Sequence, residues 1–262
     1  MSKIDLTISN EMVIPTVEST WFINQRPETN FAVGMIAVGD QILPGREQEH
    51  DGYLKLRANV YAYQTQMIPH SDVREDGTEV DNDDVRSTHW ALLERSKEGE
   101  GLARVVGSIR TIEKRAMDPR PLPIEEFFPE KFTDNPLPIG STEVSRYIAR
   151  HENPRVQAQM SAPLFKKVVA HITAHGLVPT FGVVEPTVER YLKSGLGVPL
   201  ERIADPKFVP EYAADNLGIS VDVPAMAKGL GFDSDQAVNR IRATEQNIEH
   251  FSLNTDINRT AA

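Results

Sequence analysis

The spacing of apolar side chains near the start of the chain predicts a helix. Over residues 48–64 they recur at steps of three, four and one, as one face of a helix requires, at Tyr53, Leu56, Val60 and Tyr61. Arg57 lies one turn before Tyr61 on nearly the same face. The pattern therefore places one cation beside the apolar side of this helix.

Runs rich in β-branched residues predict the strands. Residues 31–38 indicate an early strand, and residues 88–94 and 103–110 predict a β-hairpin because a charged, glycine-containing segment separates them. A proline-rich connection follows. Three further strands are predicted at residues 142–149, 178–184 and 219–223.

The later helices complete the expected fold. Ser161 is a candidate N-cap and Gly176 a candidate end for a second helix, and residues 187–193 predict a shorter one. Hairpins thus come early and crossovers late, which favours an α/β (α+β) fold with helices packed on a mixed sheet. The organisation that we expect is an N-terminal extension of uncertain structure at 1–45, a core domain at 46–230 and a C-terminal helical extension or tail at 231–262.

Composition narrows the function classes. The 262 residues include 28 Lys and Arg against 38 Asp and Glu, a net charge of −10, so we expect no nucleic-acid partner. The absence of cysteine excludes disulfides, thiolate nucleophiles and cysteine-ligated metal sites. No run approaches the ~20 apolar residues that cross a bilayer, and the first residues lack the apolar core of a signal peptide. We therefore expect a cytoplasmic protein without a transmembrane segment.

Several common catalytic motifs are absent from the sequence. It contains no P-loop, no dinucleotide-binding glycine motif and no His-Glu-x-x-His helix. Among the seven histidines only His171 and His175 have ligand-like spacing, and no acid in that helix completes a site. We interpret this pair as a polar helix face and expect no metal site.

An acidic segment allows two interpretations. Residues 71–86 hold seven acids and two arginines, which alone is typical of a solvated loop. The alternative is a buried charged network, formed if folding brings these acids to three basic side chains: Arg57, Arg110 and Arg146. In the strand at 142–149, Glu143 and Ser145 share one face, and Arg146 joins them only if the strand bends or bulges.

Taken in order, several motifs resemble the signature of a known family. They are Leu56-Arg57-x-x-x-Tyr61, Glu79-x-Asp81-x-x-Asp84, Gly107-Ser108-x-Arg110, Phe127 or Phe128, and Ser141-x-Glu143-x-Ser145-Arg146-Tyr147. Across residues 50–200 this set resembles the acyl-homoserine-lactone (autoinducer) synthases of the GNAT-like acyltransferase superfamily. The resemblance implies a GNAT-like mixed, mostly antiparallel sheet flanked by helices.

The resemblance also implies a reaction. Enzymes of this family take an acyl chain from acyl carrier protein, or sometimes acyl-CoA, and transfer it to the amine of S-adenosylmethionine, after which lactone closure releases methylthioadenosine. No tightly bound cofactor is implied. Carried over by position, the catalytic residues would be Glu143, Arg146 and Ser141, and the substrate-binding residues Arg57, Tyr61, Asp81, Asp84, Arg110, Phe127 and Phe128.

These residue types suit the chemistry. Acids and arginines close together fit an acceptor that carries an ammonium and a carboxylate. Glu143, directly or through water, would accept the proton of the attacking amine, and a backbone N–H after it would stabilise the thioester oxygen. Core packing is the simpler interpretation, and an acyl channel the alternative, for Phe165, Val168, Val169, Phe181 and Val183.

Two departures keep other functions open. Tyr61 stands where the family usually has Phe, and Met67 stands where it has a tryptophan that shapes the S-adenosylmethionine pocket. One alternative is therefore an N-acyltransferase for another amine, such as an amino acid. The other is a non-catalytic module that binds a carrier protein or an acyl ligand.

A basic segment in this acidic protein predicts where the donor docks. Residues 144–176 carry five basic side chains against Glu152, which would attract an acidic carrier protein; a solvated helix face is the alternative. Residues 150–161 contain no glycine, so the pyrophosphate loop of acetyltransferases is missing and a carrier-protein donor is favoured. Carrier-binding roles are expected for Arg150, Arg155, Lys166 and Lys167.

Overall fold

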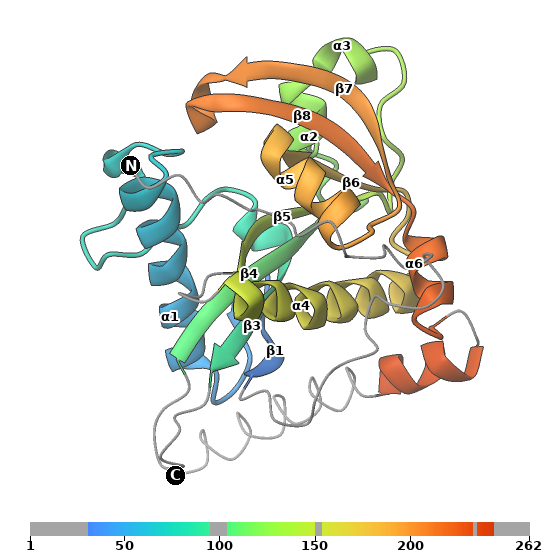
Figure 1. Cartoon of the computed structure of the whole chain (residues 1–262), viewed down its shortest axis with the longest axis horizontal. Coiled ribbons are helices and arrows are strands. Elements are labelled where there is room, and N and C mark those ends of the chain that lie inside the picture. The colour runs from blue at the N-terminus through green and yellow to red at the C-terminus, as the bar shows by residue number, and fades with distance from the viewer. Residues whose placement is uncertain (1–30, 95–103, 150–153, 233–234, 244–262) are drawn as a thin grey trace.

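The computed structural model describes residues 31–94, 104–149, 154–232 and 235–243. One eight-stranded sheet forms its centre, in the order β2-β1-β3-β4-β5-β6-β8-β7 (Figure 1). The strands are β1 (Phe31–Val38), β2 (Gln41–Ile42), β3 (Ser87–Glu94), β4 (Arg104–Glu113), β5 (Thr142–Ala149), β6 (Thr180–Val184), β7 (Leu200–Val209) and β8 (Ala214–Val221). Neighbouring strands are antiparallel except β5 and β6. The predicted mixed, mostly antiparallel sheet is confirmed.

Helices flank this sheet, as predicted. They are α1 (Glu47–Ala58), α2 (Pro123–Phe127), α3 (Pro129–Phe132), α4 (Pro154–His175), α5 (Pro186–Arg190) and α6 (Val223–Gly229), and a further helix spans residues 235–243. Both α1 and α5 continue into a π-helical turn, at Asn59–Gln64 and Tyr191–Gly195. The predicted helix at 48–64 therefore exists, with a wider last turn.

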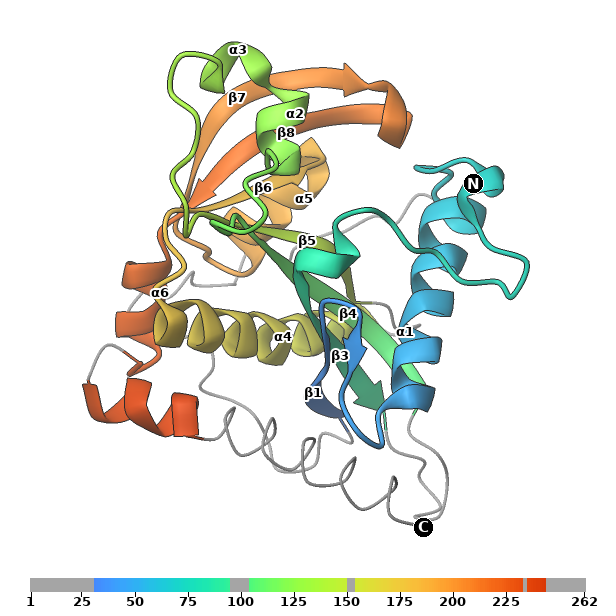
Figure 2. The same cartoon turned by 180° about the vertical axis from the view of Figure 1, so that it is seen from behind.

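Side-chain alternation along β3 explains how the helices are placed. Trp90 and Leu92 point to the face that packs against α4, whereas Ala91 and Leu93 point to the face that packs against α1. Figures 1 and 2 show α1 and α4 flanking the central strands. β3 is buried on both faces, which is why it reads as a continuous apolar run.

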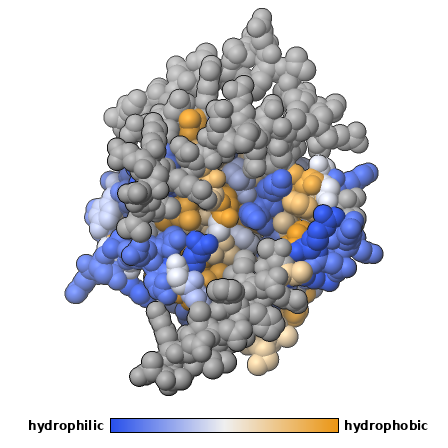
Figure 3. Space-filling view, turned by 90° about the horizontal axis from the view of Figure 1, so that it is seen from below, coloured by the Kyte–Doolittle hydropathy of each residue, from blue (hydrophilic) through white to orange (hydrophobic). Residues whose placement is uncertain are grey.

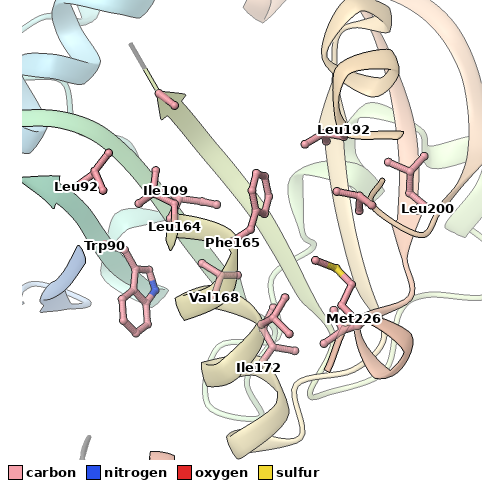
Figure 4. Close-up of a cluster of buried hydrophobic side chains, with 14 of the residues drawn as sticks. Trp90, Leu92, Ile109, Leu164, Phe165, Val168, Ile172, Leu192, Leu200 and Met226 are labelled. Atoms are coloured by element: carbon pink, nitrogen blue, oxygen red, sulfur yellow. The ribbon is translucent and has the colours of Figure 1, made fainter. Parts of the chain in front are cut away.

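The largest apolar core lies around α4. In Figure 4, Phe165, Val168 and Ile172 on this helix face the side chains of Leu192 and Met226. These helix positions follow the 3.6-residue repeat, so one apolar side of α4 is buried. In Figure 3, apolar side chains gather near the middle of the face seen from below, between hydrophilic ones.

The sheet opens between β5 and β6. Their parallel pairing consists of two residue pairs, Thr142 with Thr180 and Glu143 with Phe181. Beyond Glu143, β5 continues to pair with β4, and β6 pairs with β8. Backbone groups on the open edge of β5 therefore have no ladder partner across the gap.

Two local predictions are corrected by the structure. Helix α4 begins at Pro154, so Ser161 is an interior residue and not an N-cap. The proline-rich connection contains α2 and α3, and an additional strand, β7, precedes β8. The strand predicted at residues 31–38 is confirmed as β1, and β1 and β2 pair in the sheet within the segment expected to be an N-terminal extension. The domain boundaries themselves stay a prediction.

Candidate active site

Six charged side chains meet on the α1 side of the sheet. They are three arginines and three acids, so their formal charges cancel. We call them the arginine–carboxylate cluster: Arg57, Glu79, Asp81, Asp84, Arg110 and Arg146. Helix α1, the loop before β3, and strands β4 and β5 supply them. The buried network that the sequence allowed is therefore present, and the solvated-loop interpretation is wrong for this part of the acidic segment.

Asp84 holds two arginines of the cluster in place. Its Oδ1 lies 2.7 Å from Arg57 Nη1 and 2.6 Å from Arg110 Nη1, and its Oδ2 accepts from Arg57 Nη2 and from the Asp81 backbone N–H. Burial alone would raise the pKa of Asp84, but the charges of Arg57 and Arg110 outweigh it and hold the pKa below its usual range. Asp84 is thus an ionised clamp for both cations.

Asp81 is the most accessible acid of the cluster. Its side chain is 26% exposed, against 3% for Glu79 and 10% for Asp84. Arg110 Nη1 lies 2.6 Å from its Oδ1, and Arg146 Nη2 lies 2.8 Å from its Oδ2. These arginines overcome burial and keep the pKa of Asp81 well below its usual range. A small cationic ligand would therefore meet Asp81 first.

A bulge in β5 brings Arg146 into the cluster. Ser145 pairs with Arg110, but Ile148 pairs with Ser108, so one extra residue is inserted in β5. Arg146 adopts a left-handed backbone with a φ of 50°, and its carbonyl accepts a hydrogen bond from Ser108 Oγ at 2.8 Å. Ser145 meanwhile accepts from Arg110 Nε at 2.8 Å. Ser145 and Arg146 thus serve the same site although they are sequence neighbours.

Tyr53 and His89 form hydrogen bonds that hold Arg57 and Asp84 of the cluster. His89 Nε2 lies 3.0 Å from the Asp84 carbonyl, which only accepts, so this nitrogen carries the proton. His89 Nδ1 then accepts from the Tyr53 hydroxyl at 3.1 Å, and that hydroxyl is 3.5 Å from Arg57 Nη1. Burial lowers the pKa of His89 to about 4, so the ring is neutral at pH 7. The chain of hydrogen bonds fixes both Arg57 and the Asp84 backbone.

Glu143 lies where β5 and β6 part. It is 1% exposed, and its Oε2 accepts a hydrogen bond of 2.8 Å from the Ile124 backbone N–H at the start of α2. Burial raises the pKa of Glu143 to about 8, although the Ile124 hydrogen bond and Arg110 oppose the shift. A carboxylate with such a pKa is suited to taking up a proton near neutral pH.

An apolar pocket lies on the other side of β5, in the gap between β5 and β6. Four of the five apolar candidates for an acyl channel line it, whereas Val183 packs in a different cluster. The walls are almost entirely apolar and come from β5, β6, β8, α4, α5 and α6. Strand β5 contributes Val144 and Tyr147 to the pocket, next to Glu143 and Arg146.

The remaining predicted residues differ in their proximity to the cluster. The Tyr61 ring is 5.1 Å from Arg146 Cζ, and its hydroxyl donates to the Tyr147 carbonyl at 3.3 Å. Phe127 is half-buried, whereas Phe128 is fully buried in the core beneath α2. Ser141 is buried, and its Oγ has no hydrogen-bond partner in the described part of the chain.

The predicted carrier-binding residues are only partly described. Lys166 is half-buried and Lys167 exposed on α4. Arg150 and the side chain of Arg155 lie outside the described residues. Arg146, which contributed to the predicted basic segment, is committed to the arginine–carboxylate cluster.

Four residues of the site were given no catalytic or binding role in the sequence analysis. Tyr53, His89 and Ser145 bind members of the cluster, and Tyr212, from the turn between β7 and β8, stacks beside Arg146. Tyr53 carried a signal, since it lies one turn before Arg57 on the predicted helix. His89 carried none, because its predicted strand bears no arginine. Tyr212 carried none either, because the turn in which it lies was not predicted.

Metal ligation and membrane insertion find no support among the described residues. No group of three or more His, Asp or Glu side chains there is arranged to hold a metal ion. Within the same residues, no helix has the length and apolar character needed to span a bilayer.

Comparison with known proteins places the fold. No protein-family model matches the chain, and no curated protein matches it in sequence. Among solved structures, TofI in a ternary complex with an inhibitor and MTA shares a TM-score of 0.55 at 20% identity, over 80% of this chain and 99% of TofI. The AHL synthase LasI has a TM-score of 0.53 at 14% sequence identity, and the match covers 74% of this chain and 91% of LasI. FeeM, an N-acyl amino acid synthase from uncultured soil microbes, has a TM-score of 0.52 at 15% sequence identity, and the match covers 79% of this chain and 96% of FeeM.

These identities are low, so the likeness concerns the fold. The chain has the fold of acyl-homoserine-lactone synthases and of an N-acyl amino acid synthase.

Proposed function

We propose that this protein is an acyltransferase that moves an acyl chain from a thioester to an amine. The observation that carries the proposal is the double role of β5. Val144 and Tyr147 line an apolar pocket, while Glu143 and Arg146 belong to the charged side of the same strand. An acyl chain in the pocket would place its thioester beside Glu143, where the sheet opens.

The charged side suits an acceptor that carries both an ammonium and a carboxylate. Asp81 is the accessible anion, and Arg146 is the cation next to it. Arg146 Nε is buried and has no hydrogen-bond partner among the described residues, so this donor is available for a carboxylate oxygen. The cluster is otherwise internally neutral, and it would therefore orient a zwitterion without a large change in charge.

The transfer itself needs a base and an oxyanion donor. The neutral amine attacks the thioester carbonyl carbon, an amide C–N bond forms, the C–S bond breaks, and the thiol departs. Glu143, directly or through a water, accepts the proton that the amine loses and returns it to the thiolate. A backbone N–H on the open edge of β5 stabilises the carbonyl oxygen. No acyl-enzyme is required, in agreement with a chain that lacks cysteine.

S-adenosylmethionine and a free amino acid both carry the required groups. The autoinducer-synthase motifs favour the former, and Met67 at the family's tryptophan position favours the latter. Incubation with acyl carrier protein or CoA thioesters and a panel of amines, followed by mass spectrometry, decides between them. An acyl-homoserine lactone or an N-acyl amino acid supports the proposal. Tight binding of the thioester without any amide would instead indicate a non-catalytic binding module.

Donor recognition by carrier protein is the second part of the proposal. Exposed Lys167 and half-buried Lys166 lie on α4, which also lines the apolar pocket. Reversal of both to Glu should slow association with acyl carrier protein and weaken its dependence on salt, because such charges act on encounter and are screened beyond about 8–10 Å. Lys131→Glu on α3 serves as the control for reversal of a lysine elsewhere on the surface. Transfer from a small thioester should be unaffected, and equal losses with both donors would contradict the docking role.

A further inference from the structure

The turn between β7 and β8 carries an aromatic side chain to the arginine–carboxylate cluster. Pro210–Tyr212 forms a short 3-10 turn, and Ala213 closes it with a left-handed backbone, φ 48°. The Ala213 N–H donates to the Pro210 carbonyl at 3.2 Å. Tyr212 is half-buried, although it lies in a hairpin turn.

Three contacts hold this hairpin against the segment that contains α2 and α3. Lys207 Nζ lies 4.6 Å from the ring centroid of Phe128 and 3.3 Å from Glu130 Oε2. The Tyr212 and Phe127 rings meet edge to face, with centroids 5.0 Å apart. The turn therefore has a defined position relative to α2, which also supplies the Ile124 N–H to Glu143.

The rings of Tyr61 and Tyr212 both lie near the guanidinium of Arg146. Arg146 Cζ is 5.1 Å from the Tyr61 ring centroid and 5.9 Å from that of Tyr212. The side chain of Arg146 is nine-tenths buried, and its Nε has no partner among the residues that the structure describes. The Tyr212 ring thus lies beside the guanidinium that carries this unpartnered donor.

Tyr212 also lies within electrostatic reach of the reacting groups. Its pKa is raised by burial and is further affected by Arg146, Glu143, Arg110 and Asp81. The contacts of the ring itself are with Arg146 and Phe127. Its partial exposure leaves part of the ring accessible to a bound molecule.

We infer that Tyr212 contacts the acceptor amine and helps to determine which amine is acylated, by forming one wall beside the carboxylate-binding edge of Arg146. The inference rests on the proposed acyltransferase function. The acceptor class that this geometry fits is an α-amino acid or an amino-acid derivative, whose carboxylate binds Arg146 while its side chain packs against the Tyr212 ring.

The test compares Tyr212→Ala, Tyr212→Phe and a control, Phe208→Ala. Phe208 lies in the same hairpin but is 61% exposed, so its loss leaves the cluster untouched. Kinetics are measured with acyl carrier protein thioester and with S-adenosylmethionine or single amino acids as acceptors. Calorimetric titration of the same amines, without donor, gives binding independently of turnover. Thermal melting checks that each variant folds.

We expect Tyr212→Ala to raise the KM and Kd of the amine at least tenfold, with the KM of the thioester changed less than twofold. The ratio of kcat/KM between two amines should shift by a similar factor. Tyr212→Phe should keep the wild-type amine binding and the wild-type preference between amines, because the ring makes the contact. Phe208→Ala should resemble the wild type. If a folded Tyr212→Ala variant binds and selects amines as the wild type does, or loses donor and acceptor binding equally, the inference is wrong while the proposed function stands. A wild type that acylates no amine overturns the function itself, and the inference with it.

Discussion

Arg110 and Arg146 each bind one of the two carboxylate oxygens of Asp81: Arg110 binds Oδ1 and Arg146 binds Oδ2. Regular alternation along β5 would turn Arg146 away from the face that Ser145 shares with Arg110. The left-handed backbone at Arg146 and the bulge around it reverse this direction. The position of the candidate acceptor site therefore depends on one inserted residue in one strand.

Arg146 is expected to be needed for turnover more than for folding. Arg146→Lys keeps the charge but removes the planar guanidinium and its Nε donor, so we expect kcat/KM for the amine to fall at least tenfold, or about 1.4 kcal/mol. Arg104→Lys, at a 73% exposed ion pair on β4, is the control. Steady-state kinetics with a melting curve checks this. Full activity in a folded Arg146→Lys enzyme would remove Arg146 from the site.

Asp84→Asn should chiefly lower stability, whereas Asp81→Asn should chiefly weaken binding of the amine. Asp84 is the buried clamp of Arg57 and Arg110, so Asp84→Asn should cost about 3–5 kcal/mol of unfolding free energy. Asp81 is partly exposed, so Asp81→Asn should destabilise less and chiefly raise the KM of the amine. Urea unfolding and kinetics on both variants check the contrast. Two variants with the same stability and the same KM would contradict this division of roles.

Glu143→Gln should lower turnover at least tenfold, because the amide cannot accept the proton of the amine. It should also change the pH dependence of stability. The pKa of Glu143 is raised by folding to about 8, so the folded state binds this proton more tightly than the unfolded chain, and the associated stability is lost as pH rises from about 4.5 to 8.

The glutamine variant lacks this loss. Its unfolding free energy, relative to that of the wild type, should therefore increase between pH 5 and pH 8, by a few kcal/mol at most. Chemical denaturation at several pH values measures the difference. A constant difference across this range would show that Glu143 is not buried as the structure places it.

His89 predicts the opposite pH dependence. Its pKa is lowered to about 4 in the folded protein, so its contribution to stability is present above pH 6.5 and is lost as pH falls through 4. His89→Gln keeps a donor and an acceptor but does not titrate. The stability advantage of the wild type over this variant should shrink between pH 6.5 and pH 4. Parallel stability curves would mean that His89 takes up its proton without cost.

Neighbouring valines of β6 test the acyl pocket. Val184 lines it, whereas Val183 points to the other face and packs near α2. Val184→Phe fills the pocket, so kcat/KM should fall most for the longest acyl thioesters and least for the shortest. Val183→Phe adds the same volume outside the pocket and should leave the chain-length preference unchanged. If both variants shift the preference alike, the acyl chain does not lie between β5 and β6.

The sequence predicted the elements whose apolar pattern is strong. Residues 48–64 and 142–149 were recognised because one side of each is buried against the sheet or its helices. β7 was missed because it is an edge strand in which polar residues such as Glu201 and Lys207, together with Pro206, hide the alternation. Its register is also interrupted twice.

The candidate site was predictable in its members but not in its geometry. The acids and arginines of the cluster were named from motif order. Whether Arg146 faces them depends on a left-handed backbone that arginine rarely adopts and that no local pattern encodes. Ser161 shows the reverse error: a serine that suits an N-cap is buried inside α4, where its Oγ bonds the hydroxyls of Tyr147 and Tyr191.

The central claim is that one strand joins an acyl pocket to an amine site, with Glu143 between them. The most direct measurement follows thiol release and amide formation together, in one reaction containing acyl carrier protein thioester and S-adenosylmethionine or an amino acid. The account predicts equal amounts of thiol and amide with the wild type, and both reduced at least tenfold in folded Glu143→Gln. Thiol release without amide, or no release with any amine from a folded wild type, would contradict it.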